Sequence, residues 1–194
     1  MNTIAILYAT REGQTEKIAD FLARHIQEHG FRVEIWNLRE TREIDPERYS
    51  AMVLAASVHA GSHEREMVQY VRAHAAKLHS VPTAFLSVTL SEAGVERPNA
   101  TAEERARFEA DVHKVLEQFY KETGWRPPRV QPVAGALLYS KYNFFVRFIM
   151  KRIARKAGAE TDTSHDYEYT DWAALEHFAE QFSAEVAAGM KDAG

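Results

Sequence analysis

Six consecutive residues near the N-terminus have the clearest potential for binding chemistry: Thr10, Arg11, Glu12, Gly13, Gln14 and Thr15. They follow a short apolar run and precede a helical pattern, so they form the turn between a strand and a helix. Two hydroxyls, a glycine that permits close backbone approach and the free N–H groups of a helix N-terminus favour a phosphate. The segment is not a P-loop, because no Gly-Lys-Ser/Thr follows, and its single glycine excludes the dinucleotide fingerprint. A phosphate site and an ordinary capped turn are both compatible with these residues.

Two further segments carry small and polar residues at the ends of predicted strands. The first comprises Ser57, Val58, His59, Ala60 and Gly61, and the second comprises Ser87, Val88, Thr89 and Leu90. Neither contains Trp or Tyr, so His59 is the only candidate in the first segment for stacking on a flat ligand. We expect no metal site, because the pairs His25/His29 and His59/His63 lack a convergent set of three or four ligands.

Alternating apolar runs and helical patterns must position these segments. Strands are predicted over residues 3–9, 31–38, 51–56, 81–90 and 130–138. Helices are predicted from Thr15 to Gly30, from Ser62 to Leu78, from Thr101 to about Thr123, and from Thr170 or Asp171 onward. Thr101 and Glu104 form a capping box. Residues 92–100 are interpreted as a polar loop.

The alternation of five strands with helices predicts an α/β, doubly wound fold, with a five-stranded parallel sheet covered by helices on both faces. We expect residues 1–194 to form a single domain. Two strand orders are compatible with the pattern, 2-1-3-4-5 and the dinucleotide-binding order. Both place a ligand beyond the carboxyl ends of the strands, so the loops after strands one, three and four are the expected site.

Residues 140–169 are predicted to be an insertion between strand five and the last helix. From Lys141 to Gly158 the chain has six basic residues and no acidic one, at a spacing that predicts a basic amphipathic helix. This helix is open to three interpretations: packing on the body, contact with an anionic membrane, or binding of a flat ligand that bears carboxylates. The candidate ligand contacts are Phe144, Arg147, Phe148, Lys151 and Arg155.

Composition narrows the function classes. A net charge of −4 argues against general nucleic-acid binding. The absence of cysteine excludes disulfides, iron–sulfur clusters and thiolate zinc sites. The sequence has no run of 18 apolar residues and no secretion signal, so we expect a cytoplasmic protein. The basic helix would allow peripheral contact with the cytoplasmic face of the inner membrane.

The first turn resembles the phosphate loop of flavodoxins, Ser/Thr-x-Thr-Gly-x-Thr, in which Thr10, Gly13 and Thr15 match and Glu12 replaces the middle threonine. More narrowly, Thr-Arg-Glu-Gly-Gln-Thr resembles the loop of the flavodoxin-like, quinone-dependent protoporphyrinogen IX dehydrogenases of bacterial haem synthesis. Residues 134–139, 160–163 and 169–172 resemble the same family, so the similarity runs nearly end to end.

This resemblance implies a flavodoxin-like fold with strand order 2-1-3-4-5 and an FMN cofactor held by the three loops. It implies that the protein oxidises protoporphyrinogen IX and passes the electrons to menaquinone or ubiquinone. The inserted helix would then meet the substrate, the membrane or both. The sequence offers no convincing catalytic acid or base. Two alternatives remain open: a flavodoxin-type electron carrier, and an FMN-dependent quinone reductase supplied by a nicotinamide cofactor.

Overall fold

The computed structural model describes residues 2–41, 43–141 and 162–192. Five parallel strands form its main sheet: β1 (Thr3–Ala9), β2 (Arg32–Asn37), β3 (Ala51–His59), β5 (Thr83–Thr89) and β6 (Arg129–Ala134). Their order is β2-β1-β3-β5-β6, so the predicted order 2-1-3-4-5 is confirmed. Since β1 leads to β2 on one side and β3 lies on its other side, the topological switch point falls beside the end of β1.

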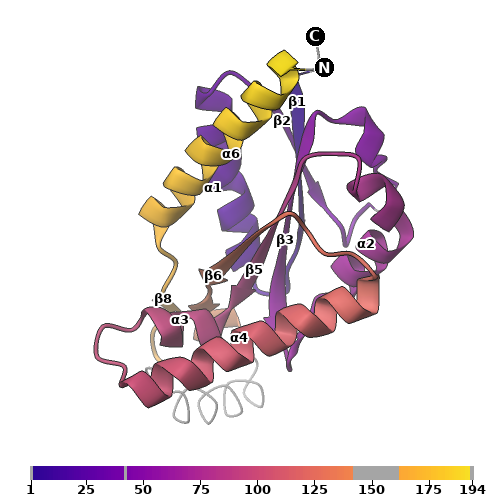
Figure 1. Ribbon diagram of the computed structural model, residues 1–194. Helices are drawn as coiled ribbons and strands as arrows, with labels where there is room; N and C mark the ends of the chain where they lie inside the picture. The colour runs from indigo at the N-terminus through magenta and orange to yellow at the C-terminus, as the bar shows by residue number, and fades with distance from the viewer. Residues whose placement is uncertain (1, 42, 142–161, 193–194) are drawn as a thin grey trace.

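Helices cover both faces of this sheet. One face packs against α1 (Gln14–Glu28) and α6 (Trp172–Asp192), which lie side by side in Figure 1. The other packs against α2 (Arg65–Leu78) and α4 (Ala102–Thr123). Successive strand residues point to opposite faces, so Ile6 joins the first core with Leu22 and Phe178, whereas Leu7 joins the second with Phe119. Burial on both faces explains why the central strands are continuous apolar runs.

Local signals fix the ends of several elements. The expected capping box of α4 is present, with Thr101 and Glu104 bonding reciprocally, and Gly124 ends that helix at a φ of 69°. A 3₁₀ turn (Pro46–Arg48) begins at Asp45, whose carboxylate accepts from the Glu47 N–H. These are interactions between near neighbours in the chain, and the sequence pattern located them.

The structure corrects the predicted polar loop over residues 92–100. Leu90–Glu96 form a helix, α3, which begins at Thr89, whose side chain accepts from the Glu92 N–H. Gly94 lies so close to α4 that an added Cβ would come within 2.5 Å of the Phe108 ring. Contact with α4 therefore stabilises a helix that has little apolar periodicity of its own.

Two other boundaries differ from the predictions. A short hairpin strand, β4 (Ser62–His63), pairs with the end of β3 before α2 begins, so the second helix starts at Arg65 and not at Ser62. The fifth predicted strand ends at Ala134, and β7 (Ala136–Leu137) pairs separately with β8 (Tyr167–Glu168). A final 3₁₀ turn spans Tyr139–Lys141.

The β7–β8 ladder lies at the base of the predicted insertion. Ser140 adds a second link across this base, because its N–H and its hydroxyl both donate to the carboxylate of Asp166, at 2.8 and 2.5 Å. The predicted amphipathic helix, with Phe144, Arg147, Phe148, Lys151 and Arg155, lies outside the described residues. The bounds of the insertion, 140–169, stay a prediction.

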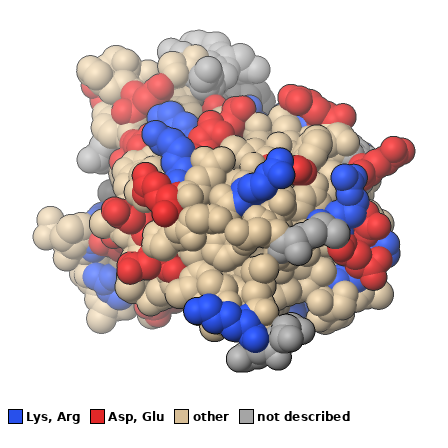
Figure 2. Space-filling view, turned by 90° about the horizontal axis from the view of Figure 1, so that it is seen from above, with Lys and Arg blue, Asp and Glu red and all other residues tan. Residues whose placement is uncertain are grey.

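Figure 2 views the end of the molecule at which β1 begins, opposite the carboxyl ends of the parallel strands. Acidic and basic side chains are interspersed on this face and alternate around its rim. Such a mixed surface gives no single-sign field for steering a charged ligand. The topology places the expected site at the opposite end, beyond the carboxyl ends of the strands.

Candidate functional site

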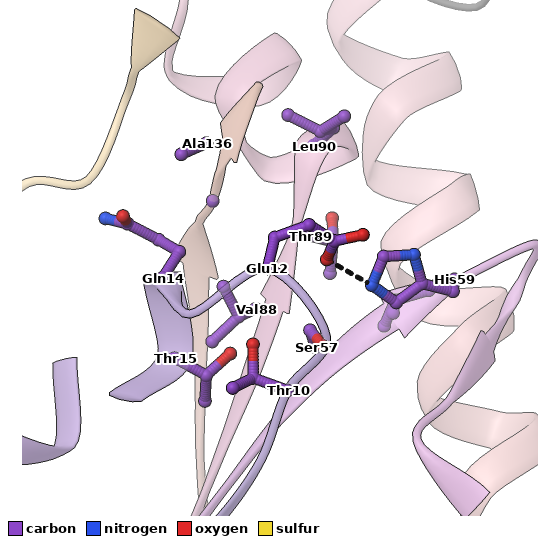
Figure 3. A pocket seen from close by; sticks show the side chains of 12 residues that line it. Thr10, Glu12, Gln14, Thr15, Ser57, His59, Val88, Thr89, Leu90 and Ala136 are labelled. Carbon is purple, nitrogen blue, oxygen red and sulfur yellow. Dashed lines mark ion pairs between the residues drawn. The ribbon is translucent and has the colours of Figure 1, made fainter. Parts of the chain in front are cut away.

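A pocket lies at the carboxyl ends of β1, β3 and β5, where the topology places it (Figure 3). Its empty space, including the open mouth, is about 440 Å³. The lining residues are Thr10, Glu12, Gln14, Thr15, Ser57, Val58, His59, Val88, Thr89, Leu90, Gly135 and Ala136. All except the last two were sequence candidates, so the fold brings the three predicted loops to one place.

The turn after β1 leaves polar groups free to meet a ligand. Gly13 adopts a φ of 100°, and its N–H donates to the Thr10 hydroxyl at 3.2 Å. Within the described residues, no side chain caps the N-terminus of α1. The Thr15 hydroxyl and the Gln14 amide oxygen are both buried and have no hydrogen-bond partner in the described part of the chain. Buried polar groups are almost always paired in folded proteins, so these two indicate a missing partner.

Gln14 also connects the pocket to the end of the predicted insertion. Its amide nitrogen donates to the Thr170 hydroxyl at 2.9 Å, and that hydroxyl donates to the Ala134 carbonyl at 2.7 Å. The next two residues, Gly135 and Ala136, complete the pocket wall. Sequence reasoning missed both as lining residues, because only the pairing of β6 with β5 brings them beside Thr89.

Four ionisable side chains form one wall of the pocket and the layer behind it; we call Arg11, Glu12, His59 and Glu64 the charged cluster. His59 Nε2 lies 2.8 Å from Glu12 Oε2 and 3.4 Å from Glu64 Oε1. Arg11 donates from Nε to both carboxylate oxygens of Glu64, at 3.0 and 3.2 Å. The cluster therefore joins the turn after β1 to the segment between β3 and α2.

Glu64 holds the centre of the charged cluster. Its side chain is only 2% exposed, and it also accepts from the Ser57 hydroxyl at 3.3 Å. A buried carboxylate is tolerated only where partners compensate for lost hydration. Sequence reasoning missed Glu64; the available signal was an acidic residue immediately before a helix, which alone is commonplace.

Not all sequence candidates face the pocket. The Ser87 hydroxyl lies 2.9 Å from His63 Nε2, inside the core. His63 packs against the rings of Phe85 and Phe119, which stack on each other, and burial lowers the pKa of His63 to about 3. Ala60 and Gly61, at φ values of 49° and 81°, form the tight turn from β3 to β4. Their contribution is to fix the direction of His59 and Ser62.

Neither a candidate metal site nor a membrane-spanning helix occurs among the described residues. Among them, no group of three or more His, Asp or Glu side chains is arranged to hold a metal ion. In the same part of the chain, no helix has the length and apolarity needed to cross a bilayer. The groups that the pocket presents to a ligand are hydroxyls, backbone N–H groups, an apolar wall and the charged cluster.

Comparisons with known proteins agree with this architecture. The family described as Flavodoxin domain matches residues 5–164. A relative in Escherichia coli (strain K12), protoporphyrinogen IX dehydrogenase (quinone), is 34% identical over 92% of this chain and 93% of its own length. The chain belongs to the flavodoxin-like protoporphyrinogen IX dehydrogenase family. A relative of the same name in Leishmania major is 32% identical over 92% of this chain and 74% of its own length.

Solved structures show the same fold at low sequence identity. Flavodoxin 1 from Bacillus cereus has a TM-score of 0.52 and 15% identity, over 93% of this chain and 96% of that one. The rubredoxin oxygen:oxidoreductase of Desulfovibrio gigas has a TM-score of 0.53 and 14% identity, over 98% of this chain and 37% of that one. These similarities establish that this chain has the flavodoxin-like fold.

Proposed function

We propose that this protein binds FMN and oxidises protoporphyrinogen IX to protoporphyrin IX, a step of haem synthesis, with a quinone as the electron acceptor. The observation that carries the proposal is the 34% identity to the Escherichia coli enzyme of that name, which extends over nearly the full length of both chains. Menaquinone and ubiquinone are the candidate acceptors.

The residues of the pocket suit a flavin mononucleotide. The uncapped N-terminus of α1 and the unpartnered Thr15 hydroxyl would bind its phosphate. The unpartnered Gln14 oxygen is a hydrogen-bond acceptor and suits a hydroxyl of the ribityl chain. The segments ending at His59 and Leu90 would flank the ring. The flavin supplies the redox chemistry, because it accepts two electrons from an organic substrate and gives them to a quinone.

The substrate contacts remain a proposal from the sequence. Protoporphyrinogen carries propionates, for which Arg147, Lys151 and Arg155 are suitable partners, and its flat product suits stacking on Phe144 and Phe148. The same basic helix suits peripheral contact with anionic lipid on the cytoplasmic side, where the quinone is dissolved. Release from anionic vesicles as salt rises would support that contact, whereas equal binding to neutral vesicles would contradict it.

An anaerobic turnover assay tests the function. Purified protein loaded with FMN is mixed with protoporphyrinogen IX and a soluble quinone, and porphyrin fluorescence is followed against a protein-free control. Quinone-dependent formation of porphyrin is expected. A flavodoxin-type carrier would show none, and a quinone reductase would consume NADH or NADPH in place of porphyrinogen.

Cofactor binding is tested separately by fluorescence titration of the apoprotein. Thr15→Ala removes one hydrogen bond to a charged phosphate, which is worth about 1.5–3 kcal/mol, so FMN affinity should fall by about tenfold or more. Thr41→Ala, outside the pocket, is the matched control. If saturating FMN neither quenches nor shifts the melting temperature of the wild type, the protein is not an FMN enzyme.

A further inference from the structure

The charged cluster has a composition that phosphate binding does not explain. A loop that receives an anionic phosphate gains nothing electrostatically from a glutamate, yet Glu12 lines the pocket together with His59 (Figure 3). Their side chains are 20% and 24% exposed, so both are within reach of water and of a bound ligand. An imidazole held by carboxylates beside a reaction site is an arrangement suited to proton transfer.

The charges of the cluster balance only when His59 is protonated. Arg11 contributes one positive charge, and Glu12 and Glu64 contribute two negative charges, so the cluster carries −1 around a neutral imidazole. Gain of a proton by His59 brings the total to zero. The resulting imidazolium lies within 3.4 Å of both carboxylates, one of which is almost fully buried.

The geometry also indicates which ring atom is basic. A carboxylate oxygen 2.8 Å from Nε2 favours the neutral tautomer whose hydrogen lies on Nε2, since a lone pair there would repel the carboxylate. Nε2 is buried and makes no hydrogen bond of normal geometry in the described part of the chain, so its contacts with Glu12 and Glu64 are electrostatic. This leaves the lone pair on Nδ1, for which the described residues supply no hydrogen-bond partner.

We propose that His59 is the proton acceptor of the dehydrogenation, an inference that rests on the proposed function. In each of the three two-electron steps a C–H bond of a bridging methylene would break, and its electron pair and hydrogen would pass together to the oxidised flavin. In two of these steps a pyrrole N–H then breaks; its electron pair stays on the porphyrinogen, and its proton bonds to Nδ1 of His59. In the remaining step the proton comes from the fourth bridging methylene, whose C–H electron pair stays on the ring to complete its conjugation. Glu12 and Glu64 hold the imidazolium until its proton passes to water.

The first test needs neither flavin nor substrate. Nuclear magnetic resonance of the ¹⁵N-labelled apoprotein measures the tautomer of His59. The neutral ring should carry its hydrogen on Nε2. Glu12→Gln removes the nearer carboxylate and should lower the fraction of the neutral ring that carries its hydrogen on Nε2. A neutral ring protonated on Nδ1, or a tautomer fraction unchanged by Glu12→Gln, would overturn the proposal.

The second test uses turnover of the FMN-loaded enzyme. His59→Gln should lower kcat by about 100-fold or more, the usual contribution of a positioned base, in protein that retains FMN. Wild-type activity should fall in acidic medium, because a protonated imidazole cannot accept the substrate proton. His59→Gln should lose this acidic fall, whereas a side chain that only shapes the pocket would leave it unchanged. His113→Gln, a histidine 76% exposed on α4, is the control.

The two proposals fail in different ways. If the wild type does not convert protoporphyrinogen, the proposed function is wrong, and with it the role of His59. If the wild type converts protoporphyrinogen and His59→Gln retains the wild-type rate and pH profile, the proposed function is supported. The role proposed for His59 is then wrong.

Discussion

The ion pair between Arg11 and Glu64 should respond very differently to loss of either partner. The Glu64 side chain is 2% exposed, whereas that of Arg11 is 55% exposed. Arg11→Gln therefore leaves a charged carboxylate in a buried position without its strongest partner. Glu64→Gln leaves a guanidinium that turns to water, and the neutral amide that replaces the carboxylate is cheaper to bury.

The structure sets the expected magnitudes. Removal of one partner of a buried ion pair lowers the free energy of unfolding by about 3–5 kcal/mol. Glu64 retains the Ser57 hydroxyl at 3.3 Å and His59 at 3.4 Å, so we expect the lower end, about 3 kcal/mol, for Arg11→Gln. Glu64→Gln loses a charge-assisted bond to a half-exposed partner, for which about 1 kcal/mol is expected after solvent screening.

Urea unfolding of the apoprotein at pH 7 measures both changes. The double variant Arg11→Gln/Glu64→Gln should be more stable than Arg11→Gln alone, because it no longer buries an unpaired charge. Glu117→Gln, in the exposed pair with Arg126, is the control and should change stability by less than about 0.5 kcal/mol. If Arg11→Gln costs no more than Glu64→Gln, burial of the carboxylate does not govern this cluster.

Three further predictions concern stability. Burial lowers the pKa of His63 to about 3 from an ordinary value of 6.5, so below pH 6.5 the unfolded state binds a proton that the folded state does not. The free energy of unfolding therefore falls as pH drops below 6.5, by up to about 1.4 kcal/mol per pH unit. His63→Gln should flatten this slope in urea titrations between pH 6.5 and 4.5. Burial, then the charges of Glu96 and Glu109, raise the pKa of Glu92 to about 7, so its ionisation weakens the fold as pH rises from 4.5 to 7. Glu92→Gln should raise the free energy of unfolding at pH 8 by about 1 kcal/mol, after allowance for the partial exposure of Glu92, and should not raise it at pH 4.5. Equal gains at both pH values in urea titrations would contradict this. Gly94→Ala should lower the free energy of unfolding by about 1–3 kcal/mol, because the added Cβ would overlap the Phe108 ring. The double variant Gly94→Ala/Phe108→Leu should recover part of that loss in chemical denaturation.

Elements governed by near neighbours were predictable from the sequence. Continuous apolar runs indicated the buried parallel strands, and their alternation with helices indicated the α/β class. The capping box at Thr101 and the glycine after α4 act within one turn of the helix, so the residue pattern specified them. The turn from Thr10 to Thr15 was located for the same reason, since its strand and helix are contiguous with it.

Features that depend on contacts across the chain were decided by the tertiary structure. Helix α3 was interpreted as a loop because its helicity depends on packing against α4, which propensity does not encode. Gly135 and Ala136 reach the pocket only through the pairing of β6 with β5. Glu64 stands 53 positions from Arg11, and only the shared carboxyl edge of β1 and β3 brings them within 3.0 Å. The sequence thus determined the fold class and the position of the turn after β1, whereas the charged cluster arose from folding, because its energy depends on distance and burial and not on separation along the chain.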